Sequence, residues 1–301
     1  MLYEHLLLIR RKTMPEVKPT GPNPLQKYFR QPKIYISLPS HGRWYPEGSI
    51  EYTENGEYPV YAMTAKDELL FKTPDALLNG QATVDVVQSC IPAIKDAWQV
   101  PAIDMDAILV AIRIATYGEK LEIKGKVPGT TIERAFDLDL RRVLDKFGSV
   151  VFDDKVQTNE MKITIRPQTY REFTNTAIKT FEEQRIASVV SDDTMSDEEK
   201  LVKFNQAFTR LTGITVDMVA NGIVSIETSE GDIVTDKNHI AAFINNADKH
   251  FFKAITDRIE NEKKKFELEP IRVVASEEEI KDGAPAEYTV PVTFDQASFF
   301  A

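Results

Sequence analysis

The sequence is poor in residues that bind metal ions or form covalent cross-links. Cys90 is the single cysteine among 301 residues, so an intrachain disulfide and a cysteine-based zinc site are both excluded. His239 and His250 are two of four histidines, and they stand eleven positions apart on one predicted helix. At ~1.5 Å per residue they are roughly 16 Å apart along its axis, too far to share a metal ion. We therefore predict no metal site and no cofactor.

The sequence motifs of phosphate-binding and hydrolytic enzymes are also absent. Gly118 and Gly125 have six residues between them, whereas a phosphate-binding P-loop requires four. Neither Gly-x-Gly-x-x-Gly nor Gly-x-Ser-x-Gly occurs. Carboxylate pairs such as Asp104 with Asp106 are expected by chance in a chain with 47 acidic residues. We predict a protein that is not an enzyme and binds no small molecule, with a hydrolase that uses scattered carboxylates as the remote alternative.

Long hydrophobic runs and a basic overall charge are lacking too. The apolar run Leu6–Ile9 covers four residues and precedes the nearest basic residues, unlike a secretory signal, and no segment approaches the ~20 apolar residues of a membrane span. The net charge of −10 opposes binding to nucleic acid, although residues 1–33 carry seven Lys or Arg against two acids. This basic arm contains Tyr28 and Phe29, which could stack on bases, but the rest of the chain carries −15. We expect neither a membrane nor a nucleic acid as partner.

The pattern of prolines, strands and helical stripes predicts an α+β fold. We expect a small N-terminal unit of strands and short helices, followed by a mainly helical C-terminal unit with a β-hairpin. The predicted division has four parts: a flexible, basic, Pro-rich arm over 1–33; an α+β domain over 34–127; a mainly helical domain over 128–270 with a strand at 160–166 and a hairpin at 223–234; and, over 271–301, a linker, a terminal strand and a Phe-Phe tail.

Apolar residues at helical spacing mark three stripes in the second half of the chain. One comprises Phe173, Ala177 and Phe181, and a second comprises Leu201, Phe204, Phe208 and Leu211, ending near Gly213. The third runs from Ile240 to Ile259 and predicts the longest helix of the protein. Residues 132–152 fit neither a helix nor a strand clearly, and the polar segment 276–287 is predicted to be a linker.

The C-terminus carries two large apolar side chains, Phe299 and Phe300, after that polar segment. Such a pair either folds back into the core of its own chain or inserts into a groove of a partner. A strand with an apolar tip at a chain end is suited to addition to the sheet edge of another protein.

Several short motifs, taken in order, resemble one protein family. They are Leu38-Pro39-Ser40-x-Gly42-x-x-Tyr45-Pro46, Tyr61-Ala62-Met63-Thr64-Ala65-x-x-Glu68, Leu77-Leu78-Asn79-Gly80, the segment Asp104 to Arg113, Tyr117-Gly118 and Pro291-Val292-Thr293-Phe294-Asp295-x-x-x-Phe299-Phe300. Together they are similar to the baseplate hub assembly proteins of T-even-type contractile-tailed bacteriophages. Many relatives carry Cys-x-x-Cys pairs that suggest a zinc ribbon. Here 130–144 and 284–288 contain no cysteine, so no structural zinc is expected.

This resemblance implies a non-enzymatic tail protein that acts in baseplate hub assembly as a chaperone-like factor and binds other tail or hub proteins. The alternative is a permanent structural subunit of the baseplate or tail. The expected location is the host cytoplasm during assembly, or the baseplate of the virion. We predict that the contacts to the partner are made by the loop that follows the first strand and by the C-terminal tail: Leu38, Pro39, Gly42, Trp44, Tyr45, Phe294, Phe299 and Phe300.

Overall fold

The computed structural model describes residues 23–72, 80–158, 161–188, 196–292 and 299–300. The chain divides into a unit of residues 1–31 and a unit of residues 32–301, and each is described by itself. In the first unit the described residues include one turn of 3₁₀ helix, η1 (Gln26–Tyr28), and the side chain of Tyr28 is exposed. The flexibility predicted for the basic arm concerns mainly residues 1–22, which lie outside the described residues.

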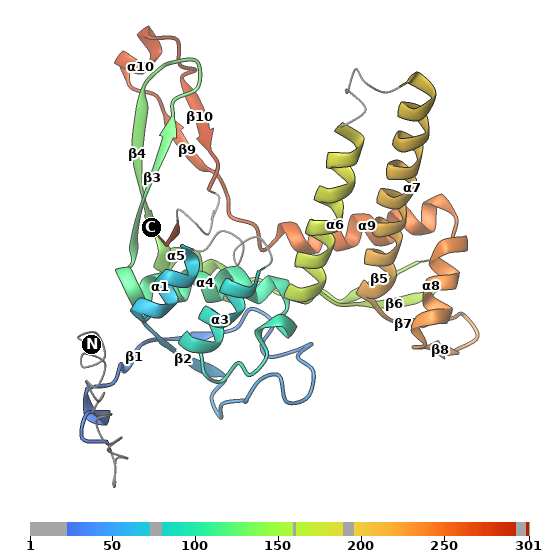
Figure 1. The fold of residues 1–301 in the computed structure, drawn as a ribbon, viewed down its shortest axis with the longest axis horizontal. Helices are drawn as coiled ribbons and strands as arrows, with labels where there is room; N and C mark the ends of the chain where they lie inside the picture. Colours follow the sequence, from blue (N-terminus) through green and yellow to red (C-terminus); the bar gives the residue numbers. More distant parts are fainter. Residues whose placement is uncertain (1–22, 73–79, 159–160, 189–195, 293–298, 301) are drawn as a thin grey trace, which may run out of the picture. The chain divides into compact units, whose positions relative to one another are not determined.

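The second unit mixes short strands with helices, as Figure 1 shows. Its strands are β1 (Pro32–Ser37), β2 (Glu57–Tyr61), β3 (Lys120–Lys126), β4 (Glu133–Asp139), β5 (Lys155–Gln157), β6 (Lys162–Ile165), β7 (Ile223–Glu227), β8 (Ile233–Val234), β9 (Ile271–Val274) and β10 (Glu287–Val290). Its helices are α1 (Ala65–Phe71), α3 (Gln81–Cys90), η2 (Ala97–Gln99), α4 (Ala102–Tyr117), α5 (Leu140–Ser149), α6 (Tyr170–Ser188), α7 (Asp197–Gly222), α8 (Lys237–Asn246), α9 (Lys249–Lys264) and α10 (Glu277–Lys281).

All strand pairs in the described part of the chain are antiparallel. β1 pairs with β2, β3 with β4, and β9 with β10, while β5, β6, β7 and β8 form a sheet in that order. The predicted hairpin at 223–234 is present, because β7 and β8 pair with Ile226 opposite Val234. The predicted α+β class is therefore confirmed.

The largest core surrounds α4, a helix that is buried on almost every side. Ile108 and Ile112 of this helix are fully buried, and β1, β2, α1, α3 and α5 supply the residues around them. Cys90, at the end of α3, is fully buried, as expected for a small apolar residue. A helix of this kind has no polar face to show to water, so its neighbours must cover it completely.

A second core lies between the four-stranded sheet and the helices α7, α8 and α9. Ile163 and Ile165 of β6 and Ile223 of β7 point into it, and Ile240 and Ile255 cover them from α8 and α9. The alternation of buried and exposed residues along β5 and β6 explains why one face of this sheet is apolar.

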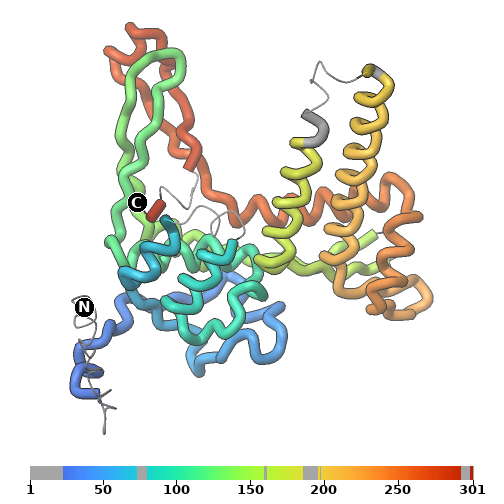
Figure 2. Tube along the Cα trace, viewed as in Figure 1, coloured from blue at the N-terminus to red at the C-terminus, as the bar shows by residue number. Residues whose placement is uncertain are grey.

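A third, smaller core joins two β-hairpins that are far apart in the sequence. Phe136 of β4 packs with Tyr288 and Val290 of β10. The turns of the two hairpins approach closely, because a Cβ atom at Gly129, whose φ is +79°, would lie 2.6 Å from the carbonyl oxygen of Gly283. Only glycine tolerates both this conformation and this approach. In the tube of Figure 2, the red β9–β10 segment runs beside the green β3–β4 segment.

All three cores draw residues from both sides of the predicted boundaries near 127 or 270. Because each core crosses one of these boundaries, the cores do not test the predicted domains 34–127, 128–270 and 271–301, and this division stays a prediction.

Two predicted helix lengths are wrong. The stripe from Ile240 to Ile259 is divided between α8 and α9, because the chain becomes extended at Ala247 and Asp248 caps the new helix by accepting the N–H groups of His250 and Phe251. Conversely, α7 continues past Gly213 to residue 222, and at 26 residues it is the longest described helix.

The segment 276–287 is also not a simple linker, because it contains α10 and connects β9 to β10. Ser276 and Glu279 form a capping box at the start of α10, in which each side chain accepts the backbone N–H of the other residue. Residues 132–152, which sequence left open, form β4 and α5.

Candidate partner-binding surface

The predicted contact loop, residues 38–46, is largely buried in the structure. Leu38 is 1% exposed and Tyr45 8% exposed, and Pro39 and Gly42 are buried as well. A Cβ atom at Gly42, whose φ is +77°, would lie 2.9 Å from the ring of Tyr52, so a glycine is required there. In this chain the loop therefore packs inwards, and most of its predicted contact residues have no surface to offer.

Asp104, in the first turn of α4, holds this loop in place. Its carboxylate accepts hydrogen bonds from the backbone N–H of Ser40 at 2.7 Å, from the hydroxyl of Ser40 at 2.5 Å and from the hydroxyl of Tyr45 at 3.0 Å. Complete burial raises the pKa of Asp104 to about 6, and the hydrogen bonds from Ser40 and Tyr45 partly oppose that rise. This role cannot be predicted from local sequence, because the hydrogen-bond partners of Asp104 are about 60 residues away.

Trp44 is the predicted contact in this loop that keeps part of its surface. Its backbone has a φ of +67°, a conformation that costs a bulky residue on the order of 1–3 kcal/mol. The guanidinium of Arg43 lies 4.3 Å from the centroid of its ring, and the ring of Phe152 packs edge-on against it at 5.2 Å. Trp44 thus connects the loop to the second core.

The C-terminal rings also fold back into the chain, the first of the two alternatives. Phe299 is 3% exposed and Phe300 6% exposed, and the ring of Phe300 stacks on that of Phe71 at 4.6 Å. Arg113 donates from Nε to the carbonyl oxygen of Phe299 at 2.8 Å, and the hydroxyl of Tyr117 donates to that of Phe300 at 3.2 Å. In this conformation neither ring is accessible to a partner. Phe294 lies outside the described residues.

The exposed apolar side chains gather instead on the helical hairpin that α6 and α7 form. The two helices pack against each other, and an ion pair joins Arg210 to Glu183 at 2.6 Å. Six large apolar side chains on them are 42–66% exposed. Val202 stands apart from the helical stripes, and the other five belong to them: Phe173, Phe181, Leu201, Phe204 and Phe208. We call these five residues the hairpin face. Sequence identified them as helical stripes but did not include them among the predicted contacts.

Helical spacing places the exposed side chains of each helix on one side of that helix. Phe173 and Phe181 are eight positions apart, slightly more than two turns, on α6. On α7, Leu201, Phe204 and Phe208 follow the alternating spacing of three and four that forms a seam along one side of a helix. The same spacing, continued along α7, reaches Met218 and Gly222, which line a cavity together with Phe173. Residues from the first turn of α6 and from the last turns of α7 therefore line the same cavity.

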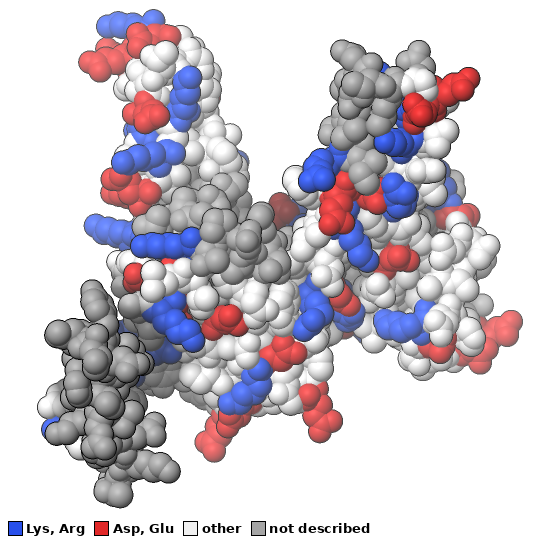
Figure 3. All heavy atoms as spheres, in the orientation of Figure 1, with Lys and Arg blue, Asp and Glu red and all other residues white. Residues whose placement is uncertain are grey.

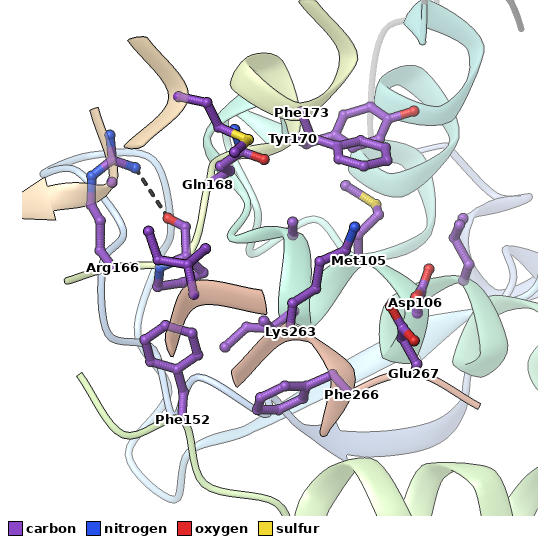
Figure 4. A pocket seen from close by; sticks show the side chains of 17 residues that line it. Met105, Asp106, Phe152, Arg166, Gln168, Tyr170, Phe173, Lys263, Phe266 and Glu267 are labelled. Carbon is purple, nitrogen blue, oxygen red and sulfur yellow. Dashed lines mark hydrogen bonds between the residues drawn. The ribbon is translucent and has the colours of Figure 1, made fainter. Parts of the chain in front are cut away.

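This cavity has a volume of about 220 Å³ and lies where α4, α6, α7 and α9 come together (Figure 4). Its walls are mainly apolar and include Met105, Leu109, Phe152, Ile259 and Phe266. A large apolar side chain is of a size to enter it. A cavity beside an exposed apolar surface is a frequent feature of protein interfaces, where it receives an anchoring side chain.

Phe152 is fixed in the cavity wall by the residue that follows it. Glu262 of α9 is fully buried and accepts the backbone N–H of Asp153 at 2.8 Å. Two cations compensate the buried carboxylate: Lys265 at 2.7 Å and Arg258 at 3.3 Å, and Arg258 also pairs with Asp153. A buried carboxylate with two cationic partners is a costly arrangement to disturb, so this wall is rigid.

Charged groups stand at one side of the cavity. Figure 4 shows the carboxylates of Asp106 and Glu267 next to each other. Desolvation by neighbouring groups raises the pKa of Asp106 to about 6; the charge of Lys263 opposes this rise and that of Glu267 adds to it. Arg166 is occupied, since it forms two hydrogen bonds with Glu172, at 2.8 and 2.6 Å.

Within the residues that the structure describes, no group of three or more His, Cys, Asp or Glu side chains could hold a metal ion. In the same part of the chain, no helix has the length and apolar character needed to cross a membrane.

A model of the T4 bacteriophage base plate proteins matches residues 32–282, more than four fifths of the chain. This chain belongs to the T4 bacteriophage base plate protein family. The match starts with β1 and ends just after α10, so it covers the hairpin face, the cavity and the second core, while β10 and the C-terminal Phe299 and Phe300 lie outside it. It supports the family to which the motifs pointed, at the level of a baseplate protein. No curated protein and no solved structure matches the chain.

Proposed function

We propose that this baseplate protein is a non-enzymatic assembly factor that binds other tail proteins while the baseplate hub is built. Membership of the base plate family supports a role in the tail. It is also the reason to expect the protein in the host cytoplasm during assembly and tail or hub proteins as its partners.

The hairpin face is the observation that carries this proposal. Phe181 on α6 and Phe208 on α7 are 66% and 63% exposed. Burial of a large apolar side chain contributes about 1.5–3 kcal/mol, and this chain already forms three apolar cores, so rings that it leaves in water are available for burial by a partner. Exposed apolar groups of this extent mark contacts with other proteins.

The experiment that tests the proposal is quantitative mass spectrometry of purified mature particles and of the lysate of infected cells. An assembly factor that leaves is expected in the lysate and absent from particles. A fixed ratio of this chain to other tail proteins in the particles would show a permanent structural subunit, and the proposal would be wrong.

A phage that carries Phe181→Ser and Phe208→Ser tests the role of the hairpin face. We expect normal levels of the protein in the cell but few complete tails. The matched control is a phage with Ile233→Thr and Val274→Thr, which change side chains that are 68% and 72% exposed outside the hairpin face. Equal tail yields from both phages would contradict a role of the hairpin face in assembly.

A further inference from the structure

We infer that the hairpin face binds the hairpin face of a second copy of this chain, with the two hairpins antiparallel, so that two pairs of helices form a four-helix bundle. The inference rests on the proposed function only in treating this face as an interface. It adds that the first molecule to bind this face is a second copy of the chain. The dimer would then be the unit that meets other tail proteins.

The hairpin face is complementary to itself, which a two-fold interface requires. At the end near the connection between α6 and α7, which we call the tip, the face presents the side chains of Leu201 and Phe204, which are 61% and 47% exposed. At the opposite end, which we call the base, it adjoins the cavity lined by Phe173, Met218 and Gly222. Antiparallel pairing places the tip of each copy over the base of the other, so both cavities receive an apolar side chain at once.

The spacing along α7 suits such a pairing. Leu201, Phe204 and Phe208 continue at intervals of three and four residues to Met218 and Gly222, so the seam runs along most of the helix. A repeat with an average of 3.5 residues is the pattern by which α-helices pack side chains into the gaps of a neighbouring helix. From Leu201 to Gly222 the seam is ~32 Å long at ~1.5 Å per residue.

The exposed area is also of the right order. Large apolar side chains each offer about 150–250 Å², so the five residues of the hairpin face expose roughly 500 Å² in each copy. A stable interface buries about 800 Å² on each partner, whereas most contacts between molecules in crystals stay below half of that. The five side chains alone thus supply most of the area that a stable dimer needs, before any polar neighbour is counted.

Charge permits two copies to meet at this place. Residues 170–188 and 197–222 carry six basic and seven acidic side chains, a net charge of −1, in a chain whose net charge is −10. Figure 3 shows Lys and Arg intermixed with Asp and Glu on the visible side of this hairpin. A nearly neutral hairpin does not attract a strongly charged partner, and two identical copies can approach each other there without strong electrostatic repulsion.

The test is the mass of the purified full-length chain, measured by sedimentation equilibrium over about a hundredfold range of concentration, because self-association follows mass action. We expect a dimer for the unaltered chain and a monomer for Phe181→Ser with Phe208→Ser. The variant with Ile233→Thr and Val274→Thr should stay a dimer. Circular dichroism confirms that each variant is folded. A monomer at every concentration, or a dimer that persists in the first variant, would overturn the inference.

Spin labels determine the orientation of the two copies. Cys90 is fully buried, so a label attaches to a cysteine introduced at an exposed site beside the face. Antiparallel pairing about the middle of the face brings labels at Thr212→Cys close together. It separates labels at Glu198→Cys by ~40 Å. In each copy Glu198 lies fourteen positions, or ~21 Å, from Thr212 along α7, and the two copies run in opposite directions, so the two offsets add. Short distances at both sites would show parallel hairpins and contradict the arrangement.

The failure of this inference differs from the failure of the proposed function. A monomeric chain that nevertheless needs the hairpin face for tail assembly would leave the function intact and assign the face to another protein. A dimer found at a fixed ratio in mature particles would support the inference and overturn the assembly-factor role.

Discussion

The loop at residues 38–46 and the α6–α7 hairpin differ in opposite ways from the exposure that their sequences suggest. The loop contains Trp44 and Tyr45 between two prolines and was predicted to contact a partner, yet most of it is buried around Asp104. The hairpin carries regular apolar stripes, the usual mark of a face turned to a core, yet Phe181 and Phe208 are exposed. Apolar periodicity therefore indicates that a face will be covered, but not by which chain.

The physical difference between the two regions is the number of neighbours that the fold supplies. The loop is enclosed because α4 passes beside it and Asp104 accepts three hydrogen bonds from Ser40 and Tyr45. The hairpin is joined to the rest of the chain at its base, where α7 packs on α8 and where Phe173 and Met218 line the cavity, while Phe181 and Phe208 stay exposed farther along it. Each of the following predictions tests this contrast.

The largest effect is expected for Asp104→Ala. Three donors on Ser40 and Tyr45 would lose their acceptor inside the core, which should lower the free energy of unfolding by about 3–5 kcal/mol. Denaturation with urea measures the change. The control is Asp85→Ala, an exposed acid on α3, which should stay within about 0.5 kcal/mol of the unaltered chain. Similar small losses in both variants would show that the loop is not held by Asp104.

A somewhat smaller effect is expected for Phe300→Ala at the C-terminus. The ring stacks on Phe71 and is 6% exposed, so its removal should lower the free energy of unfolding by about 2–4 kcal/mol, less than for an interior phenylalanine because a chain end can relax. Thermal denaturation measures it, with the 56%-exposed Phe29→Ala as the control. A variant as stable as the control would mean that the tail does not pack on α1 in solution.

The pH dependence of stability should report the burial of Asp104. Its pKa is about 6 in the folded chain against 3.8 as the ordinary value, so the folded state holds the proton more tightly. The stability that this group contributes is complete below pH ~4 and is lost as the pH rises through 6, by an amount of about 2–3 kcal/mol. Relative to Asp104→Asn, the unaltered chain should thus become less stable between pH 4 and pH 7. A constant difference over this range would exclude the raised pKa.

The smallest effect on folding is expected at the hairpin face. Phe181→Ser and Phe208→Ser replace side chains that are already 66% and 63% exposed, so each should change the free energy of unfolding of the monomer by less than about 1 kcal/mol. Urea denaturation at low protein concentration measures this. A loss as large as that of Phe300→Ala would mean that these rings pack within their own chain, and the contrast between the two regions would disappear.

Local patterns in the sequence predicted the elements well where the deciding residues are neighbours in the chain. Thr64, Thr169 and Ser196 each stand just before a helix and pair with the acid three positions later, a spacing that can be seen directly in the sequence. The prediction failed between Ile244 and Phe251, because the apolar spacing continues across the break while Asp248 starts a new helix there. A polar side chain that can cap a helix end is visible in sequence, but whether it does so depends on the packing around it.

The sequence by itself determined the α+β class, the antiparallel hairpin of β7 and β8, and the periodic apolar stripes, since each depends on residues a few positions apart. Only the tertiary structure decided that Ser40 and Tyr45 meet Asp104, that Phe300 meets Phe71, and that the hairpin face stays open. These contacts join segments about 60 to more than 200 residues apart. Their geometry follows from how whole elements pack, and side-chain spacing along a single element carries no record of it.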